Sequence, residues 1–158
     1  MSTLTTEERI DRLESIEAIK HLKAEYCIYC DQGYPPDKLG PLFAEDAIWN
    51  GGRFGRHEGR AAIESFFGGA SRDIVFAAHL ALNPMIEVTG EAASGQWRLL
   101  MPSTFNTESG PECQWLLGDY HERYVRQDGR WLFKNIDLYV NFVATHAEGW
   151  LGRASVRP

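Results

Sequence analysis

Two polar residues stand where an unpaired polar side chain is costly. Asp31 closes the helical stretch IEAIKHLKAEYCIYCD, and His79 stands alone among apolar residues in the strand-like stretch IVFAAHLALNPMIEV. A buried carboxylate or imidazole costs free energy unless it has a partner. We therefore predict that Asp31 and a ring nitrogen of His79 form a hydrogen bond of about 2.6–3.2 Å, as in a buried acid/base dyad.

The chemistry open to such a dyad is removal of a proton from carbon. A neutral imidazole is a base near neutral pH, and a carboxylate on its other nitrogen fixes the tautomer and stabilises the imidazolium. Elimination of water next to a carbonyl needs this base, an acid for the departing hydroxyl and a donor for the enolate oxygen. His79 is the candidate base, Asp31 its orienting partner and Tyr26 the candidate donor. Tyr26 and Asp31 lie about 140° apart on a regular helix, so both reach one pocket only if it straddles the helix end.

Each of these residues also has a purely structural interpretation. His79 can be a core residue with satisfied hydrogen bonds, Asp31 a turn residue bonded to backbone, and Tyr26 a core aromatic. A short Asp31–His79 distance beside a cavity favours chemistry, and a pair buried without a cavity favours structure. Candidates for the apolar wall of a substrate pocket are Trp49, Phe54, Trp97, Trp115 and Leu117.

Composition indicates one soluble domain. The chain has 158 residues, 44% of them hydrophobic and 12% aromatic, which is enough for a single core. The net charge of −6 without a basic cluster argues against nucleic acid as a partner. The polar, acidic N-terminus does not have the pattern of a signal peptide, and no run of about 18 apolar residues predicts a membrane span. We expect a cytoplasmic protein with no membrane partner.

Cysteine and histidine spacing predicts neither a disulfide nor a metal site. Cys27, Cys30 and Cys113 are an odd number, which argues for reduced thiols. Cys27 and Cys30 match C-x-x-C but lie inside a helical pattern, whereas a redox pair opens a helix after a strand. The other histidines, His21, His57, His121 and His146, have no metal-ligand spacing. We expect no metal and no cofactor.

Periodicity predicts helices first and strands afterwards. Thr5 and Glu8 form a capping box for a helix that ends before Gly33, with a break near Ser15 where the apolar spacing changes. Short helices are predicted over residues 36–45 and 59–67, with a hairpin between 47–49 and 53–57 over Asn50-Gly51-Gly52. Strands are predicted over 74–88, 94–101, 113–126 and 131–143.

This order predicts an α+β domain, with helices on one face of a curved antiparallel sheet that encloses a pocket. The core is expected over residues 8–143, with a tail over 144–158. The alternation in DYHERYV leaves open whether Tyr120 and Glu122, or His121 and Arg123, point inward.

The chain resembles the SnoaL-like branch of the nuclear-transport-factor-2-like superfamily. The likeness rests on IEAIKHLKAEYCIYCD, on GDYHERYVRQDGRWLF and on the isolated histidine. It implies a cone-shaped, cystatin-like α+β barrel and assembly as a dimer or trimer through the outer face of the sheet. The most similar branch includes bile-acid 7α-dehydratase, hexachlorocyclohexane dehydrochlorinase and scytalone dehydratase.

In the first two of these lyases the helix-ending aspartate and the strand histidine are catalytic, which corresponds to Asp31 and His79. The bile-acid enzyme has a catalytic tyrosine at the place of Tyr26, whereas the dehydrochlorinase has a lysine there and an arginine near Asp137, so dehydration is favoured over loss of halide. The resemblance implies a lyase acting on a hydrophobic, polycyclic or aromatic-like small molecule. An isomerase or polyketide cyclase with the same base, and a non-enzymatic binding or oxygenase accessory domain, stay as alternatives.

Overall fold

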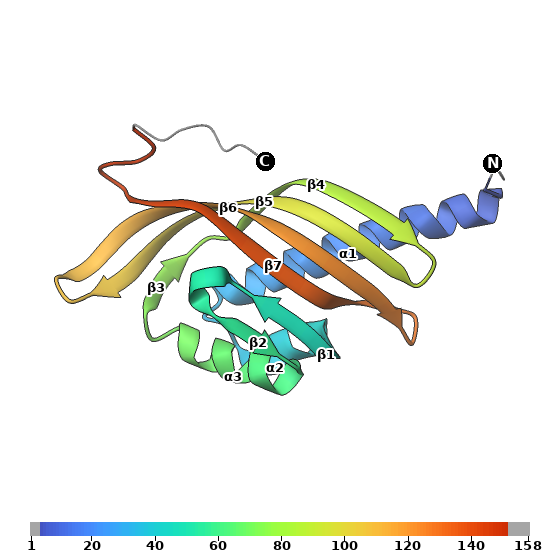
Figure 1. Ribbon diagram of the computed structural model, residues 1–158, viewed down its shortest axis with the longest axis horizontal. Coiled ribbons are helices and arrows are strands. Elements are labelled where there is room, and N and C mark those ends of the chain that lie inside the picture. The colour runs from blue at the N-terminus through green and yellow to red at the C-terminus, as the bar shows by residue number, and fades with distance from the viewer. Residues whose placement is uncertain (1–3, 152–158) are drawn as a thin grey trace.

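The helices come early in the chain and the long strands late, and Figure 1 shows them as two layers. The computed structural model describes residues 4–151. Its elements are α1 (Thr6–Asp31), α2 (Pro36–Leu39), η1 (Gly40–Leu42), β1 (Phe43–Asn50), η2 (Gly52–Phe54), β2 (Arg56–Glu58), α3 (Arg60–Ala70), β3 (Ile74–Ala77), β4 (Leu80–Thr89), β5 (Ala92–Thr107), β6 (Gly110–Gln127) and β7 (Arg130–Thr145). No helix in this part of the chain is long and apolar enough to cross a membrane.

The sheet is mixed and open. Its strand order is β2-β1-β7-β6-β5-β3, and β4 also pairs with β5. The predicted α+β class with helices on a curved sheet is confirmed, but two details were wrong. β1 runs parallel to β7, because the long excursion between them leaves their relative direction free of any hairpin. The two edges of the sheet do not pair with each other, so the barrel is not closed.

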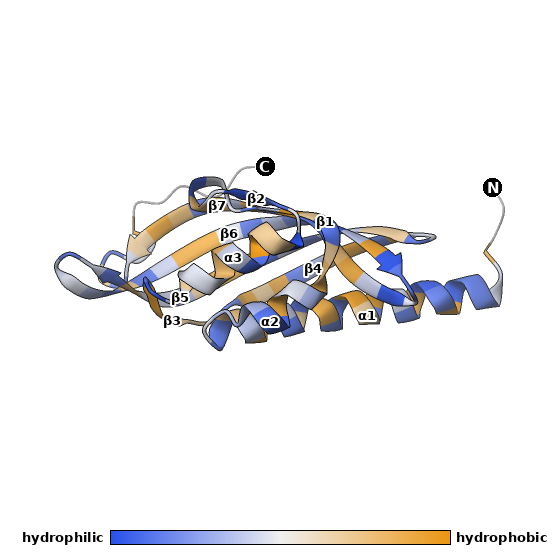
Figure 2. Cartoon of the chain, turned by 90° about the horizontal axis from the view of Figure 1, so that it is seen from below, coloured by the Kyte–Doolittle hydropathy of each residue, from blue (hydrophilic) through white to orange (hydrophobic). Residues whose placement is uncertain are grey.

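Helix α1 is continuous, so the predicted break near Ser15 was wrong. The predicted capping box is present: the Glu8 N–H donates to Thr5 Oγ1 at 3.2 Å, and the Thr5 N–H donates to Glu8 Oε2 at 2.7 Å. The end of the helix before Ser15 extends past the sheet and is mostly hydrophilic (Figures 1 and 2). Residues 4–14 are exposed, so their apolar spacing does not have to match a packing face.

The short elements after α1 differ in length from those predicted. The helix predicted over 36–45 ends at Leu42, because the backbone from Phe43 onward pairs with β7. β1 and β2 form the predicted antiparallel pair, but their loop covers residues 51–55 and contains η2. It is closed by a hydrogen bond of 2.9 Å from the Gly51 N–H to the Gly55 carbonyl oxygen. α3 begins after Gly59, as predicted.

The strand predicted over residues 74–88 is two strands, β3 and β4, which pair in succession with the same strand, β5. The break falls at Ala78 and His79. β5, β6 and β7 are longer than predicted, and β7 reaches Thr145, beyond the expected end of the core. Residues 152–158 of the predicted tail lie outside the described residues.

The open question about DYHERYV is answered by burial. Tyr120, Glu122 and Tyr124 are buried, while His121 and Arg123 are exposed on the outer face. The Glu122 carboxylate forms an ion pair of 2.5 Å with the Lys23 ammonium of α1, and both side chains are at most 1% exposed. Glu122 also accepts a hydrogen bond from the Tyr124 hydroxyl. This register directs Tyr120 into the space between the sheet and the helices.

Cysteine reactivity follows from burial. Burial raises the pKa of the Cys27 thiol to about 11 and that of Cys30 well above its ordinary value. Both groups therefore stay protonated and unreactive well above neutral pH, whereas Cys113 is exposed. We expect Ellman's reagent at about pH 8 to label one of the three free cysteines rapidly in the native protein, and all of them in denaturant. Rapid labelling of native Cys113→Ser would contradict this assignment.

Candidate active site

The break in the sheet brings His79 to the end of α1. The backbone N–H of His79 donates to Asp31 Oδ1 at 2.9 Å and to Oδ2 at 3.2 Å. The imidazole Nδ1 lies 2.7 Å from the same Oδ1 atom. The predicted hydrogen bond between these side chains is confirmed. The His79 side chain is 7% exposed and that of Asp31 34%, so the pair is buried on the histidine side only.

This arrangement determines which nitrogen of His79 is free. An ionised carboxylate can only accept hydrogen bonds, so Nδ1 carries the proton that Asp31 accepts. In the neutral imidazole Nε2 then has a free lone pair. Within residues 4–151 no hydrogen bond to Nε2 is found, and His79 lines a cavity. The geometry is that of a base supported from behind by a carboxylate.

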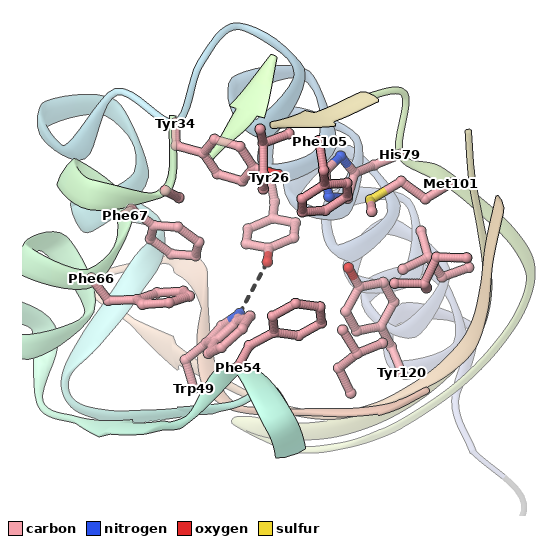
Figure 3. A pocket seen from close by; sticks show the side chains of 15 residues that line it. Tyr26, Tyr34, Trp49, Phe54, Phe66, Phe67, His79, Met101, Phe105 and Tyr120 are labelled. Atoms are coloured by element: carbon pink, nitrogen blue, oxygen red, sulfur yellow. Dashed lines mark hydrogen bonds between the residues drawn. The ribbon is translucent and has the colours of Figure 1, made fainter. Parts of the chain in front are cut away.

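The cavity is small and aromatic. It measures about 60 Å³, room for a few water molecules, and opens partly to the outside. Figure 3 shows aromatic rings from the helices, from the sheet and from the loop after α1 around it. Its wall includes Tyr26, Tyr34, Trp49, Phe67, Phe105 and Tyr120. Of the described residues that line it, only these three tyrosines, Trp49 and His79 carry a side-chain polar atom, so the cavity suits an uncharged, ring-shaped molecule.

Tyr26 lies in the cavity wall, and Asp31 does not. The Trp49 indole N–H donates to the Tyr26 hydroxyl oxygen at 3.0 Å, as Figure 3 shows, which leaves the hydroxyl proton free to be donated. Burial raises the pKa of the Tyr26 phenol well above its ordinary value, so it stays a donor. Tyr26 and Asp31 do not line one pocket, as the angle of about 140° between them allows, because Asp31 reaches the cavity only through His79.

The five residues expected in the pocket wall lie in different parts of the structure. Trp49 and Phe54 line the cavity. Trp97 is buried beside Tyr124, to which its indole N–H donates at 3.0 Å, and does not reach the cavity. Trp115 packs against His146 and Trp150 near the C-terminal end of β7, and Leu117 faces away from the wall because its neighbour Leu116 faces the cavity.

Sequence reasoning missed several residues of the wall. Tyr34 follows α1 in the loop, stacks on Phe67 with ring centroids 5.9 Å apart, and meets the His79 ring edge-on at 6.0 Å. Met101 and Phe105 come from the inward face of β5. Alternation along β5 is the signal that could have found them, since residues two apart in a strand share a face.

Within residues 4–151, no three His, Cys, Asp or Glu side chains lie close enough together to hold a metal ion. The Asp31–His79 pair itself consists of one carboxylate and one imidazole, which are groups that transfer protons.

An open curved sheet, helices on one face and a cavity between them define the cystatin-like α+β class. The model of the SnoaL-like domain matches residues 11–137, and the chain belongs to this family. Comparison with curated proteins found no match.

Solved structures share the fold. A hexachlorocyclohexane dehydrochlorinase (LinA, type 2) is 21% identical with a TM-score of 0.80, covering 95% of this chain and 97% of its own. LinA type 3 from Novosphingobium barchaimii LL02 is 23% identical with a TM-score of 0.77, covering 95% and 99%. A protein from Novosphingobium aromaticivorans described provisionally as a scytalone dehydratase is 24% identical with a TM-score of 0.75, covering 90% and 97%.

Proposed function

We propose that this protein is a cofactor-independent lyase that eliminates water from an uncharged, aromatic-like small molecule. His79 is the general base and Asp31 its orienting partner. The observation that carries the proposal is the 2.7 Å hydrogen bond from His79 Nδ1 to Asp31, formed beside a cavity that His79 lines. A close pair that opens onto a cavity favours chemistry over a purely structural hydrogen bond.

The proposed reaction is balanced within the site. His79 Nε2 takes a proton from the carbon next to a carbonyl, and the C–H electron pair becomes the carbon–carbon double bond of an enolate. When the carbonyl re-forms, the carbon–oxygen bond of the neighbouring hydroxyl breaks, and the departing oxygen receives the proton held by His79. Tyr26 donates a hydrogen bond to an oxygen of the substrate. The products are water and a conjugated ketone.

The relatives support this reading by their names, since a dehydrochlorinase and a dehydratase both carry out eliminations. An isomerase or cyclase would use the same base and differ only in where the proton goes next. A binding domain or an oxygenase accessory domain would need the cavity, but it would have no use for a free Nε2 atom of His79. The cavity, at about 60 Å³, favours a molecule with one ring over a steroid.

A screen of uncharged β-hydroxyketones with one or two rings tests the proposal. Elimination produces a conjugated ketone, whose ultraviolet absorbance rises as the substrate is consumed. We expect turnover of at least one compound by the wild type and none above background by His79→Ala. Tight binding of such compounds without turnover would favour the binding-domain alternative.

Self-association through the outer face of the sheet is also proposed. Leu80, Leu82, Met85 and Tyr139 are between 42% and 64% exposed there, and exposed apolar patches often mark protein contacts. Light scattering should give a multiple of 17.9 kDa at micromolar concentration. A monomer mass would contradict this expectation.

A further inference from the structure

The hydroxyl of Tyr120 is a donor for which the mechanism above has no use. Tyr120 is 1% exposed and lines the cavity. In the part of the chain that the structure describes, no hydrogen bond of its hydroxyl is found, whereas the hydroxyl of Tyr26 accepts one from Trp49. The Tyr120 hydroxyl is not one of the fully buried polar atoms that lack a partner, so it is accessible from the cavity and its proton is free for a bound molecule.

The hydroxyl is directed at the place where a substrate would lie. Figure 3 shows the Tyr26 and Tyr120 hydroxyls turned toward the open centre of the cavity from different sides. Their ring centroids are 6.4 Å apart, and the ring planes are nearly perpendicular, at 89°. Two donors that converge in this way can serve two oxygens of one small molecule.

A buried cation holds the Tyr120 ring in place. The Lys23 ammonium lies 3.3 Å from the Tyr120 ring centroid and 4.7 Å from that of Tyr26. A cation within about 6 Å of an aromatic face is attracted to the ring. Lys23 is itself held by its ion pair with Glu122, and neither side chain lines the cavity, so the pair fixes the position of the Tyr120 hydroxyl without touching the substrate.

We propose that Tyr120 is a second catalytic donor, which binds the carbonyl oxygen of the substrate and stabilises the enolate while His79 holds the proton taken from carbon. This assignment rests on the proposed function and leaves Tyr26 for the departing hydroxyl. The ligand class is an uncharged ring that carries an oxygen able to become an oxyanion. No proton leaves Tyr120, because burial keeps its pKa well above the ordinary value.

Binding of 4-nitrophenol tests this role without turnover, because its phenolate absorbs visible light and resembles an enolate. At a pH slightly below the pKa of the probe, wild-type protein should increase the phenolate fraction. Tyr120→Phe should weaken phenolate binding by about 10- to 100-fold, the worth of one charge-assisted hydrogen bond. Tyr29→Phe, which removes a hydroxyl outside the cavity wall, should change nothing. Toluene, which lacks the oxygen, should bind wild type and Tyr120→Phe equally.

The outcomes separate this inference from the proposed function. The protein could bind phenolate through Tyr120 and yet dehydrate no hydroxyketone. That result would support the role of Tyr120 as a donor and contradict the proposed lyase function. The assignment is overturned if Tyr120→Phe binds phenolate as tightly as the wild type, or if the wild type binds no phenolate. It is also overturned if phenolate affinity is lost in Tyr34→Phe instead. If Tyr120→Phe fails to fold, 3-fluorotyrosine at position 120 is the second variant. It preserves the shape of the side chain and makes the hydroxyl a stronger hydrogen-bond donor, so the protein that contains it should bind phenolate more tightly.

Discussion

Replacing His79 with alanine is expected to lower turnover by about 10²- to 10⁴-fold in a protein that stays folded, the range typical of a lost general base. Asp31→Asn should cost a similar factor, because an amide in that place can donate to Nδ1 and stabilise the wrong tautomer. The double variant should lose little more than either single variant, since groups that act as one unit are not additive. Steady-state rates on a compound found by the screen measure all three.

Tyr26→Phe is the matched comparison for these variants. It removes one donor from the same cavity and leaves proton transfer in place, so we expect a loss on the order of 10²-fold. Thermal melts establish that each variant is folded. Full activity in folded His79→Ala would refute the lyase assignment and put the binding-domain alternative first.

The second large effect concerns stability. Lys23→Met should lower the free energy of unfolding by about 3–5 kcal/mol, because it leaves the Glu122 charge buried without its partner. Lys23→Met combined with Glu122→Gln should cost less than the two single changes together. In that double variant no charge is left alone, and the Tyr124 hydroxyl still has an acceptor.

Lys134→Met is the control for that experiment. Lys134 pairs with Asp46 at the surface, where the two side chains are 41% and 72% exposed. Exposed pairs contribute at most about 1 kcal/mol. Urea unfolding gives the values for Lys23→Met, Glu122→Gln, their combination and Lys134→Met. An equal loss in Lys23→Met and Lys134→Met would contradict the role given to the buried pair.

The sequence predicted the parts of the site that have a local signal. A capping box and a Gly-Tyr-Pro-Pro segment bound the helix that ends at Asp31, and His79 is conspicuous among apolar neighbours. The break at Ala78 and His79 has no such signal, because alanine and histidine fit a strand. At this break the backbone N–H of His79 donates to Asp31, which is a tertiary contact that the sequence does not show.

Which side chains of a strand point inward was equally hard to predict from the sequence of that strand alone. Both registers of DYHERYV alternate polar and apolar or aromatic groups, and the choice depends on Lys23, which lies 99 residues before Glu122. Lys23 itself shares a helix face with Ile19 and Tyr26, and it is buried there because Glu122 pairs with it. Trp97 and Trp115 were assigned to the pocket on size and aromaticity, which many core residues share.

The central claim is that His79 presents a free Nε2 to the cavity while Asp31 holds the proton on Nδ1. Long-range ¹H–¹⁵N correlation spectra of the imidazole test this directly, with Asp31→Asn as the reference for a broken pair. Over the pH range in which the protein is active, we expect Nδ1 of His79 to be protonated and Nε2 to be unprotonated, and only Nε2 to shift when 4-nitrophenol binds. A proton on Nε2 throughout that range, as an imidazolium or as the other tautomer, would contradict the account.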